Sequence, residues 1–242
     1  FRSLNLALNS TTLLREIDGF QDFGAAYRNI KLPIDEAQSN LMVRRKKAAE
    51  DIEAIYSVYT KEERRAMTVR KAVPGIRSSL SKWDRIAVAL NTGNEGNLQR
   101  LTDRRLADSF TKDQLAEILS DLSKKDWDFV QSVWDYIDSY WPQIVERERR
   151  ASGVAPEKIV AQQVETRFGS YRGGYYPLRY DPRRSSRVQD DKQADIAKAV
   201  MGGTFGKAQT KNGHLKERAS SSGRPVEIDI SVFHNHINQV IY

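Results

Sequence analysis

The strongest constraint on the fold is an apolar seam between residues 127 and 144. Its members recur three or four residues apart: Trp127, Val130, Trp134, Ile137, Trp141 and Ile144. This spacing places them on one face of an α-helix. We expect the seam to form core or a subunit contact, with Trp127, Trp134 and Trp141 as the interface residues. Pro142 should bend the helix because proline disrupts the backbone ladder.

Several other helix starts carry a hydroxyl residue followed three positions later by a carboxylate or amide side chain. Thr60 with Glu63, Thr111 with Gln114, and Ser123 with Asp126 have this spacing, which is typical of capping boxes. Further helices are expected over 4–17, 35–59, 81–90, 156–168, 190–201 and from 231 onward, with a turn at 91–97 and a short strand at 226–230. The predicted fold is therefore mainly α.

We expect an irregular multi-helix domain with a long loop rich in arginine, tyrosine and glycine and at most a short β element. Three segments are predicted: an N-terminal helical segment over 1–76, a central helical core over 77–168, and a basic loop-rich region with a truncated C-terminal helix over 169–242. The chain begins with Phe1 and ends inside the last predicted helix. We therefore expect it to be a piece of a longer polypeptide.

Composition excludes several classes of function. The chain has no cysteine, which rules out a disulfide framework, a thiol nucleophile and cysteine metal ligands. No apolar run approaches the roughly 18 residues that a membrane-spanning helix needs. The net charge of +7 favours anionic partners. Its distribution along the chain matters more than its size.

A basic segment interleaved with aromatic residues lies between 167 and 187. It contains six arginines and only one acidic residue, Asp181. The candidate nucleic-acid-binding residues are Arg167, Arg172, Tyr175, Tyr176, Arg179, Arg183, Arg184 and Arg187. Arginine forks onto phosphate and aromatic rings stack on exposed bases. The alternative is an arginine-rich loop that wraps an acidic helix of the same protein or of a neighbouring subunit. The aspartates available for this are Asp126, Asp128, Asp135 and Asp138.

Evidence for an enzyme is thinner. Glu227 and Asp229, with His234 or His236, could hold a divalent metal and process nucleic acid. The alternative is that the two carboxylates are ordinary surface residues and that the histidines cap or pack against the start of a helix. No nucleotide-binding motif is complete, so the sequence predicts no cofactor, no assembled metal site and no catalytic residues. An enzyme within this segment is not favoured.

Three blocks of the sequence resemble large polyvalent proteins of phages and mobile elements. They are residues 89–100, residues 126–131 with Trp134 and Asp135, and residues 173–177 with Tyr180 and Asp181. Residues 229–232 fit the same pattern, so the resemblance covers roughly 80–242. No catalytic residue is carried over, and the transglycosylase motifs that often accompany such proteins are missing from this chain.

The resemblance implies a bacteriophage internal virion protein that leaves the capsid with the genome during DNA ejection. It implies a location in the virion interior and then in the host envelope or periplasm. The expected partners are further copies of the chain or other virion and ejection proteins. Nonspecific double-stranded DNA is a further expected partner, and the host envelope would be contacted through other parts of the parent protein. The alternative function is a metal-dependent nucleic-acid-processing module.

Overall fold

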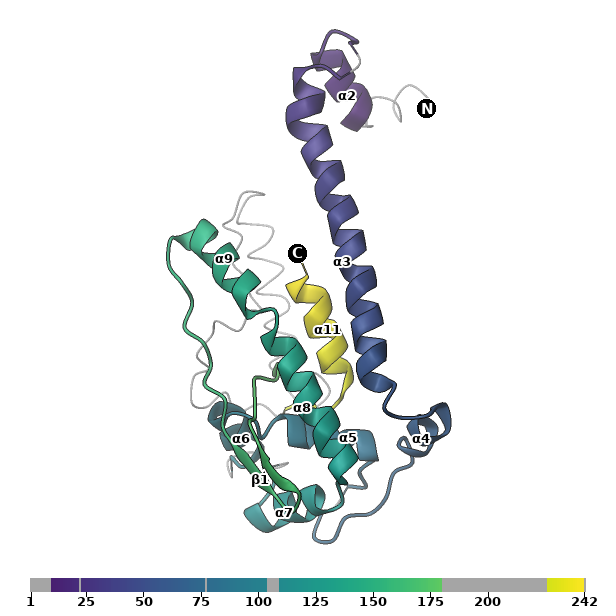
Figure 1. The fold of residues 1–242 in the computed structure, drawn as a ribbon, viewed down its shortest axis with the longest axis vertical. Helices are drawn as coiled ribbons and strands as arrows, with labels where there is room; N and C mark the ends of the chain where they lie inside the picture. Colours follow the sequence, from purple (N-terminus) through teal and green to yellow (C-terminus); the bar gives the residue numbers. More distant parts are fainter. Residues whose placement is uncertain (1–9, 22, 77, 104–108, 180–225, 242) are drawn as a thin grey trace. The chain divides into compact units, whose positions relative to one another are not determined.

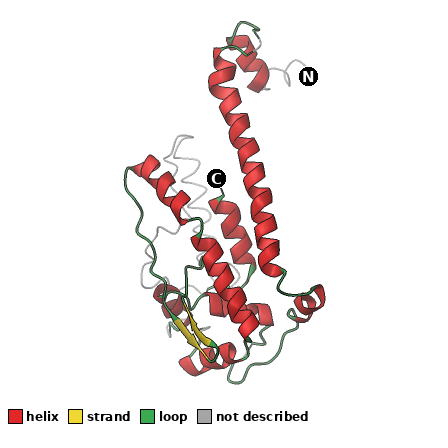
Figure 2. Cartoon of the chain, viewed as in Figure 1, coloured by secondary structure: helices red, strands yellow, loops and turns green. Residues whose placement is uncertain are grey.

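The computed structural model describes residues 10–21, 23–76, 78–103, 109–179 and 226–241. The chain divides into two compact units, Phe1–Ile52 with Ile241–Tyr242 (unit 1) and Glu53–Val240 (unit 2). Helices dominate the described residues, with one short antiparallel hairpin (Figure 2), which confirms the predicted mainly α class. The boundary lies inside the predicted 1–76 segment, and residues 169–179 and 226–240 belong to the same unit as the predicted central core.

Unit 1 consists of a short helix, a π-helical turn and most of a long helix (Figure 1). Its elements are α2 (Ser10–Ile17), the π-helix η1 (Tyr27–Lys31) and most of α3 (Leu32–Tyr56). The Asp18 carboxylate accepts hydrogen bonds from the backbone N–H groups of Ala26 and Tyr27 at 2.7 and 2.9 Å. Because these amides have no partner in the first turn of the helix, Asp18 fixes the start of the η1–α3 helix.

Unit 2 contains the other helices and strands of the described residues. They are α4 (Lys61–Ala66), α5 (Lys82–Leu90), α6 (Glu95–Leu101), α7 (Lys112–Ser120), α8 (Lys124–Asp138), α9 (Trp141–Ser152), β1 (Val164–Thr166), β2 (Gly169–Tyr171) and α11 (Ser231–Val240). β1 and β2 pair antiparallel, with Val164 opposite Tyr171.

The predicted capping boxes are all formed. Thr60 caps α4, Thr111 caps α7 and Ser123 caps α8, each in a reciprocal bond with the residue three positions later. Ser81 caps α5 in the same way through Asp84. Each box satisfies backbone donors that the helix itself leaves unpaired, which explains why these four helices start where the sequence predicts.

The core of unit 2 surrounds α5. Every residue from Ile86 to Leu90 is fully buried, so the second half of this helix is covered on all sides. α8 and α7 both pack against it. A second layer joins the end of α5 to the loops and helices around it through Val73, Leu80, Val88, Leu101, Phe110, Leu115 and Ile118. A fully buried stretch of helix requires apolar residues around its whole circumference, as residues 86–90 have.

The predicted domain boundary at 76 differs from the observed one because aromatic residues at the end of α3 belong to the unit 2 core. The ring centroids of Tyr56 and Tyr59 lie 5.2 and 5.4 Å from that of Phe129. Trp83 completes the cluster at 5.9 Å from Phe129. These contacts tie the last turn of α3 to α5 and α8.

Three expectations about local structure are wrong. Pro142 does not bend one long helix: α8 ends at Asp138, and the proline stands in the first turn of α9, where its missing N–H costs nothing. Residues 156–163 are irregular and lead into β1 instead of forming a helix. Residues 226–230 contain only an isolated bridge position and no strand.

Candidate functional site

The described arginines of the predicted basic segment all contact protein groups. Arg172 forms an ion pair with Asp135 at 2.7 Å, and Arg179 forms one with Glu227 at 3.2 Å. Arg167 donates to the backbone carbonyl of Leu122 at 3.3 Å. Its guanidinium also lies over the neighbouring Phe168 ring, 4.7 Å from the centroid. Arg183, Arg184 and Arg187 lie outside the described residues.

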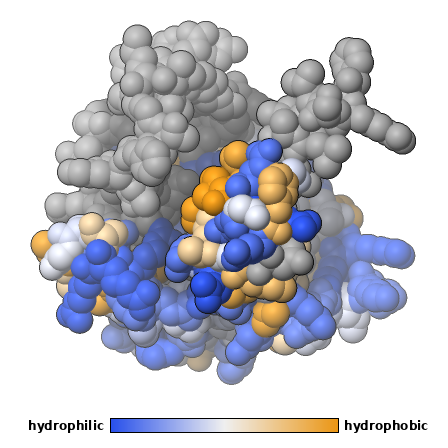
Figure 3. Space-filling model, turned by 90° about the horizontal axis from the view of Figure 1, so that it is seen from above, coloured by the Kyte–Doolittle hydropathy of each residue, from blue (hydrophilic) through white to orange (hydrophobic). Residues whose placement is uncertain are grey.

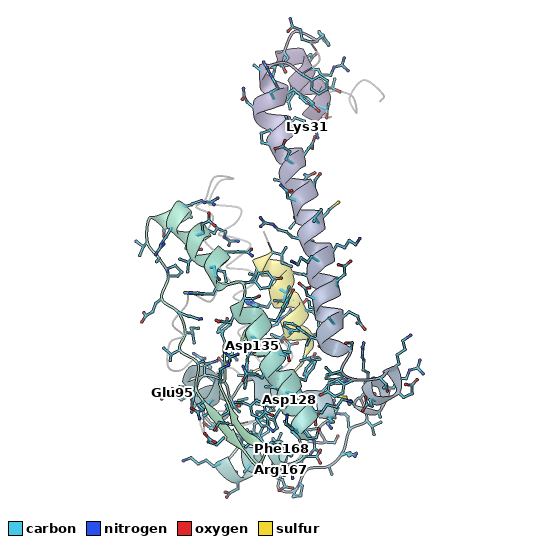
Figure 4. All side chains as sticks on the ribbon, in the orientation of Figure 1. Lys31, Glu95, Asp128, Asp135, Arg167 and Phe168 are labelled. Atoms are coloured by element: carbon cyan, nitrogen blue, oxygen red, sulfur yellow. The ribbon has the colours of Figure 1, made fainter. Side chains whose placement is uncertain are left out.

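Tyr171 and Arg172 of this segment, with Lys158 before it, contact the acidic face of α8. The Tyr171 hydroxyl donates to Asp128 at 2.8 Å, and Lys158 pairs with Asp138 at 2.6 Å. Figure 4 labels Asp128 and Asp135 along α8, and Arg167 and Phe168 at the turn of the hairpin. Together with the Arg172–Asp135 ion pair, these contacts involve three acidic residues of α8: Asp128, Asp135 and Asp138. Their partners lie between residues 158 and 172. For these residues the arrangement is the wrapping alternative that the sequence left open.

The electrostatics of this contact follow from its partial exposure. Partial burial and the hydrogen bond to Asp128 raise the pKa of Tyr171 to about 12, so the hydroxyl stays protonated and donates. The side chain of Arg172 is 77% exposed even with its ion pair. An exposed pair of this kind contributes only about 0–1 kcal/mol to stability. The acidic face of α8 therefore orients the segment more than it stabilises it.

Tyr175 and Tyr176 do not form an exposed stacking surface, which corrects the sequence prediction. Both side chains are buried, and Tyr176 is 1% exposed. Burial is the main cause that raises the pKa of Tyr176 well above its ordinary value, and its hydroxyl donates to the backbone carbonyl of Asp229 at 3.3 Å. Tyr175 lies beside His236 with ring centroids 5.8 Å apart. The two rings join the 173–177 segment to α11.

The three tryptophans predicted as interface residues have different environments. Trp127 and Trp134 are buried in unit 2, so they are core residues and not exposed contact residues. The Trp134 indole N–H donates to the carbonyl of Leu90 at 3.0 Å. Trp141 is partly exposed at the start of α9, with the Lys158 ammonium 5.8 Å from its ring centroid. The seam is therefore mainly a core surface, because α8 lays it against α5.

A buried polar cluster that was not predicted from the sequence is formed by Asn91, Asn94 and Asn97, and we call it the asparagine junction. Asn97 donates from its side-chain amide to the Asn91 side chain at 3.1 Å and to the carbonyl of Tyr176 at 2.9 Å. Asn94 caps α6 and also reaches the carbonyl of Gly174 at 3.4 Å. The asparagine-rich run predicted only a turn. The three side-chain amides were a further signal, because each amide needs hydrogen-bond partners once it is buried.

Glycines let the two backbones of this junction approach closely. The Gly93 carbonyl accepts from Gln162 N–H at 2.7 Å and from Gly174 N–H at 2.9 Å. A Cβ added at Gly93 or Gly174 would come within 2.5 Å of Trp134. The sequence blocks 89–100, 126–131 with Trp134, and 173–177 therefore meet in one place. What they build together is an interlocked core.

The residues of the predicted metal alternative do not converge. His234 shares a hydrogen bond with the Tyr56 hydroxyl at 3.1 Å, and Glu227 pairs with Arg179. His236 lies against Tyr175, and the Asp229 carboxylate accepts from the N–H of Ser231 at the start of α11. Within the described ranges, no three histidine, aspartate or glutamate side chains gather closely enough to hold a metal ion.

Unit 1 presents exposed apolar side chains on α2 and just after it. Phe20 and Phe23, between α2 and η1, have positive φ values of 62° and 60°. Each phenylalanine is 67% exposed. Leu13 and Ile17 on α2 are exposed as well. Figure 3 looks onto this end of unit 1 and shows hydrophobic residues at its surface. We call Leu13, Ile17, Phe20 and Phe23 the apolar turn.

A bulky residue at positive φ is strained, because its Cβ crowds the following carbonyl, at a cost of about 1–2 kcal/mol per residue. The apolar turn combines this strain with exposed aromatic surface. Burial of these rings against another molecule would offset the strain, since burying a phenylalanine contributes about 1.5–3 kcal/mol. Strained, exposed aromatic residues of this kind are typical of contact sites.

No helix in the described part of the chain is both long enough and apolar enough to cross a membrane. No protein-family model matches the sequence, and no curated protein or solved structure is significantly similar to it. The relation to large polyvalent proteins therefore stays a prediction from the sequence blocks.

Proposed function

We propose that this chain is a structural part of a phage internal virion or DNA-ejection assembly. Unit 2 serves as a rigid core, and unit 1 supplies contacts to other protein subunits. The observation that carries the proposal is the apolar turn, in which Phe20 and Phe23 are two-thirds exposed at strained backbone positions. Isolated apolar residues at a surface are ordinary, but a strained cluster of them is typical of a protein contact.

The second support comes from the sequence blocks that carry the family resemblance. They meet at the asparagine junction, where Gly93, Gly174 and Trp134 are in close contact and Asn97 joins α6 to Tyr176. Such a junction fixes one arrangement of distant segments, as a scaffold requires. Exposed donors remain on Arg172, so a DNA-facing surface stays a prediction.

The test is whether the polypeptide belongs to the particle. In the phage that encodes this chain, quantitative mass spectrometry should find it in full virions and find less of it in particles that have ejected their DNA. The double variant Phe20→Ser, Phe23→Ser should lower its copy number per virion several-fold while leaving the thermal stability of the purified chain nearly unchanged.

The matched control is Val154→Ser with Val160→Ser. These valines are 68% and 81% exposed in unit 2, so exposed apolar side chains are likewise replaced by serine, but away from the apolar turn. Copy number should stay at the wild-type level in this control. Absence of the polypeptide from full virions would overturn the proposed function, and equal losses in both double variants would remove the apolar turn from it.

A further inference from the structure

The middle of α3 is a helix exposed on all sides. Every residue from 36 to 47 is exposed except Leu41, which is half-buried. Met42 and Val43 are among the most exposed large apolar residues, at 73% and 68%. A single helix in water is marginally stable, and most helices in proteins are held by packing of one face. The described residues of unit 1 leave this stretch without such a cover.

Charges on α3 and at the end of η1 follow a definite order on one face. Lys31 pairs with Asp35 at 2.5 Å, and Lys46 pairs with Glu50 at 3.9 Å, each one helical turn apart. Figure 4 labels Lys31 near the start of this helix. Asp35, Met42, Lys46 and Glu50 are spaced seven, four and four residues apart, so they share a face. The order along it is positive, negative, Met42, positive, negative.

We propose that α3 pairs antiparallel with α3 of a second copy of this chain, about a two-fold axis between Asn40 and Leu41. Lys31 of each copy then faces Glu50 of the other, and Asp35 faces Lys46. Both pairs are symmetric in sequence about the same midpoint. The inference rests on the proposed structural function, which it deepens by naming one partner.

Charge complementarity selects both the partner and the direction. A parallel pair in register would place each lysine against its own copy and each carboxylate against its own copy, which is repulsive. The antiparallel pair alternates the signs and builds a four-charge network at each end of the contact. It is also closed, since the same patch serves both copies.

The centre of the face suits a close approach. The two-fold axis places Met42 of each copy opposite Ser39 of the other, so a flexible side chain faces a small one. Methionine adapts to irregular gaps, and its exposed side chain would be covered by this contact. Since the contacts that set its register are charged and near the surface, pairing should weaken as salt rises.

Charge exchange in the full chain tests the proposal by sedimentation equilibrium. Asp35→Lys with Glu50→Lys makes the face wholly positive, and Lys31→Glu with Lys46→Glu makes it wholly negative. Each variant alone should have a dimer dissociation constant raised at least about 10-fold, because like charges then meet. An equimolar mixture should regain dimers, which also shows that both variants fold.

The matched control carries the same charge change one residue further along: Glu36→Lys with Asp51→Lys. These positions lie on other faces of the helix, so dimerisation should remain at the wild-type level. Three results would each overturn the proposal: a wild-type chain that stays monomeric at high concentration and low salt, a control that disrupts dimers equally, or a mixture that stays monomeric.

Orientation has its own test, because the chain has no cysteine of its own. Leu32 and Ala49 are symmetric about the proposed axis. A short thiol cross-linker should join Leu32→Cys chains to Ala49→Cys chains in a mixture and should join neither variant to itself. Efficient cross-linking of each variant alone would mean a parallel pair and would overturn the proposed arrangement. These outcomes leave virion content untouched, so they are separable from failure of the proposed function.

Discussion

Trp134 and Gly174 are in direct contact, and a Cβ added at Gly174 would lie 2.5 Å from the Trp134 Cβ. α8 and the 173–177 segment can approach this closely only because residue 174 has no side chain. The backbone N–H of Gly174 also donates to the Gly93 carbonyl at 2.9 Å. A change at this position therefore disturbs packing and hydrogen bonding together.

Gly174→Ala should lower the free energy of unfolding by about 1–3 kcal/mol through overpacking. Chemical denaturation of the purified chain measures this. Gly96→Ala is the control, since its added Cβ would meet only the Asn94 side chain at 3.7 Å, in helix α6. There alanine should stabilise by about 0.5–1 kcal/mol. Equal effects of the two substitutions would contradict the close contact at Trp134.

The asparagine junction predicts a loss of stability on removal of a single amide. Asn97→Ala leaves the Tyr176 carbonyl and the Asn91 side chain without this donor, so unfolding should become easier by about 1–3 kcal/mol. Gln99→Ala removes an exposed amide from the same helix and should change stability by less than about 0.5 kcal/mol. Denaturation midpoints compare the two variants. A neutral Asn97→Ala would mean that the junction carries no net stabilisation.

Asp126 of α8 binds two side chains from distant parts of the chain, Lys82 at the start of α5 and Tyr59 just before α4. Its fully buried carboxylate accepts from Lys82 at 2.7 Å and from the Tyr59 hydroxyl at 2.8 Å. Burial raises the pKa of Asp126, but the bonds from Lys82, Ser123 and Tyr59 outweigh it and hold the pKa below its usual value. Asp126→Asn should cost about 3 kcal/mol, because it leaves Lys82 without its counter-charge.

Asp128→Asn is the matched control for this change, two residues along the same helix. Its carboxylate is half exposed, so its loss should cost about 0–1 kcal/mol. In the wild-type chain the contribution of Asp126 is present above the pKa of an unfolded aspartate, near 4, and declines as pH falls below that value. Thermal melts from pH 5 to 2.5 should show the Asp126→Asn variant losing less stability than wild type.

His234 predicts a separate pH dependence at milder acidity. Burial lowers the pKa of His234, whose ring is hydrogen-bonded to Tyr56. The unfolded chain therefore binds a proton more readily than the folded chain as pH falls through about 6.5. Stability should decline from pH 7 to 5, and His234→Gln should flatten this part of the curve. A wild-type curve with no slope in this range would contradict the burial of the neutral ring.

Local signals in the sequence were sufficient for the helices that start with a capping box. Thr60, Thr111 and Ser123 each form the bond that their spacing predicts, because both partners lie within one turn. The seam of α8 was also correctly assigned to one helix face as far as Ile137. Beyond it, Pro142 was misjudged because a proline is equally compatible with a bend and with the first turn of a new helix.

The rest depended on contacts between distant residues. Residues 156–163 were predicted as a helix, but the N–H of Gln162 bonds to the carbonyl of Gly93 instead, a partner that no local pattern reveals. The burial of Tyr176 was also not predicted, because the Asn97 amide that donates to its backbone carbonyl lies 79 residues earlier in the chain. The acidic residues of α8 were correctly named as possible partners of Arg172. Their pairing required the fold to bring them together.

The asparagine junction also governs when the protein can finish folding during synthesis. Asn97 reaches a carbonyl 79 residues later in the chain, and its amide has no access to that partner until Tyr176 has left the ribosome. At about 5–20 residues per second, Tyr176 leaves roughly 4–16 s after Asn97 itself has left the ribosome. Throughout that interval Asn94 and Asn97 lack the backbone carbonyls of Gly174 and Tyr176, to which they donate in the folded chain. The nascent chain therefore passes through a long-lived open state that only its own later residues can end.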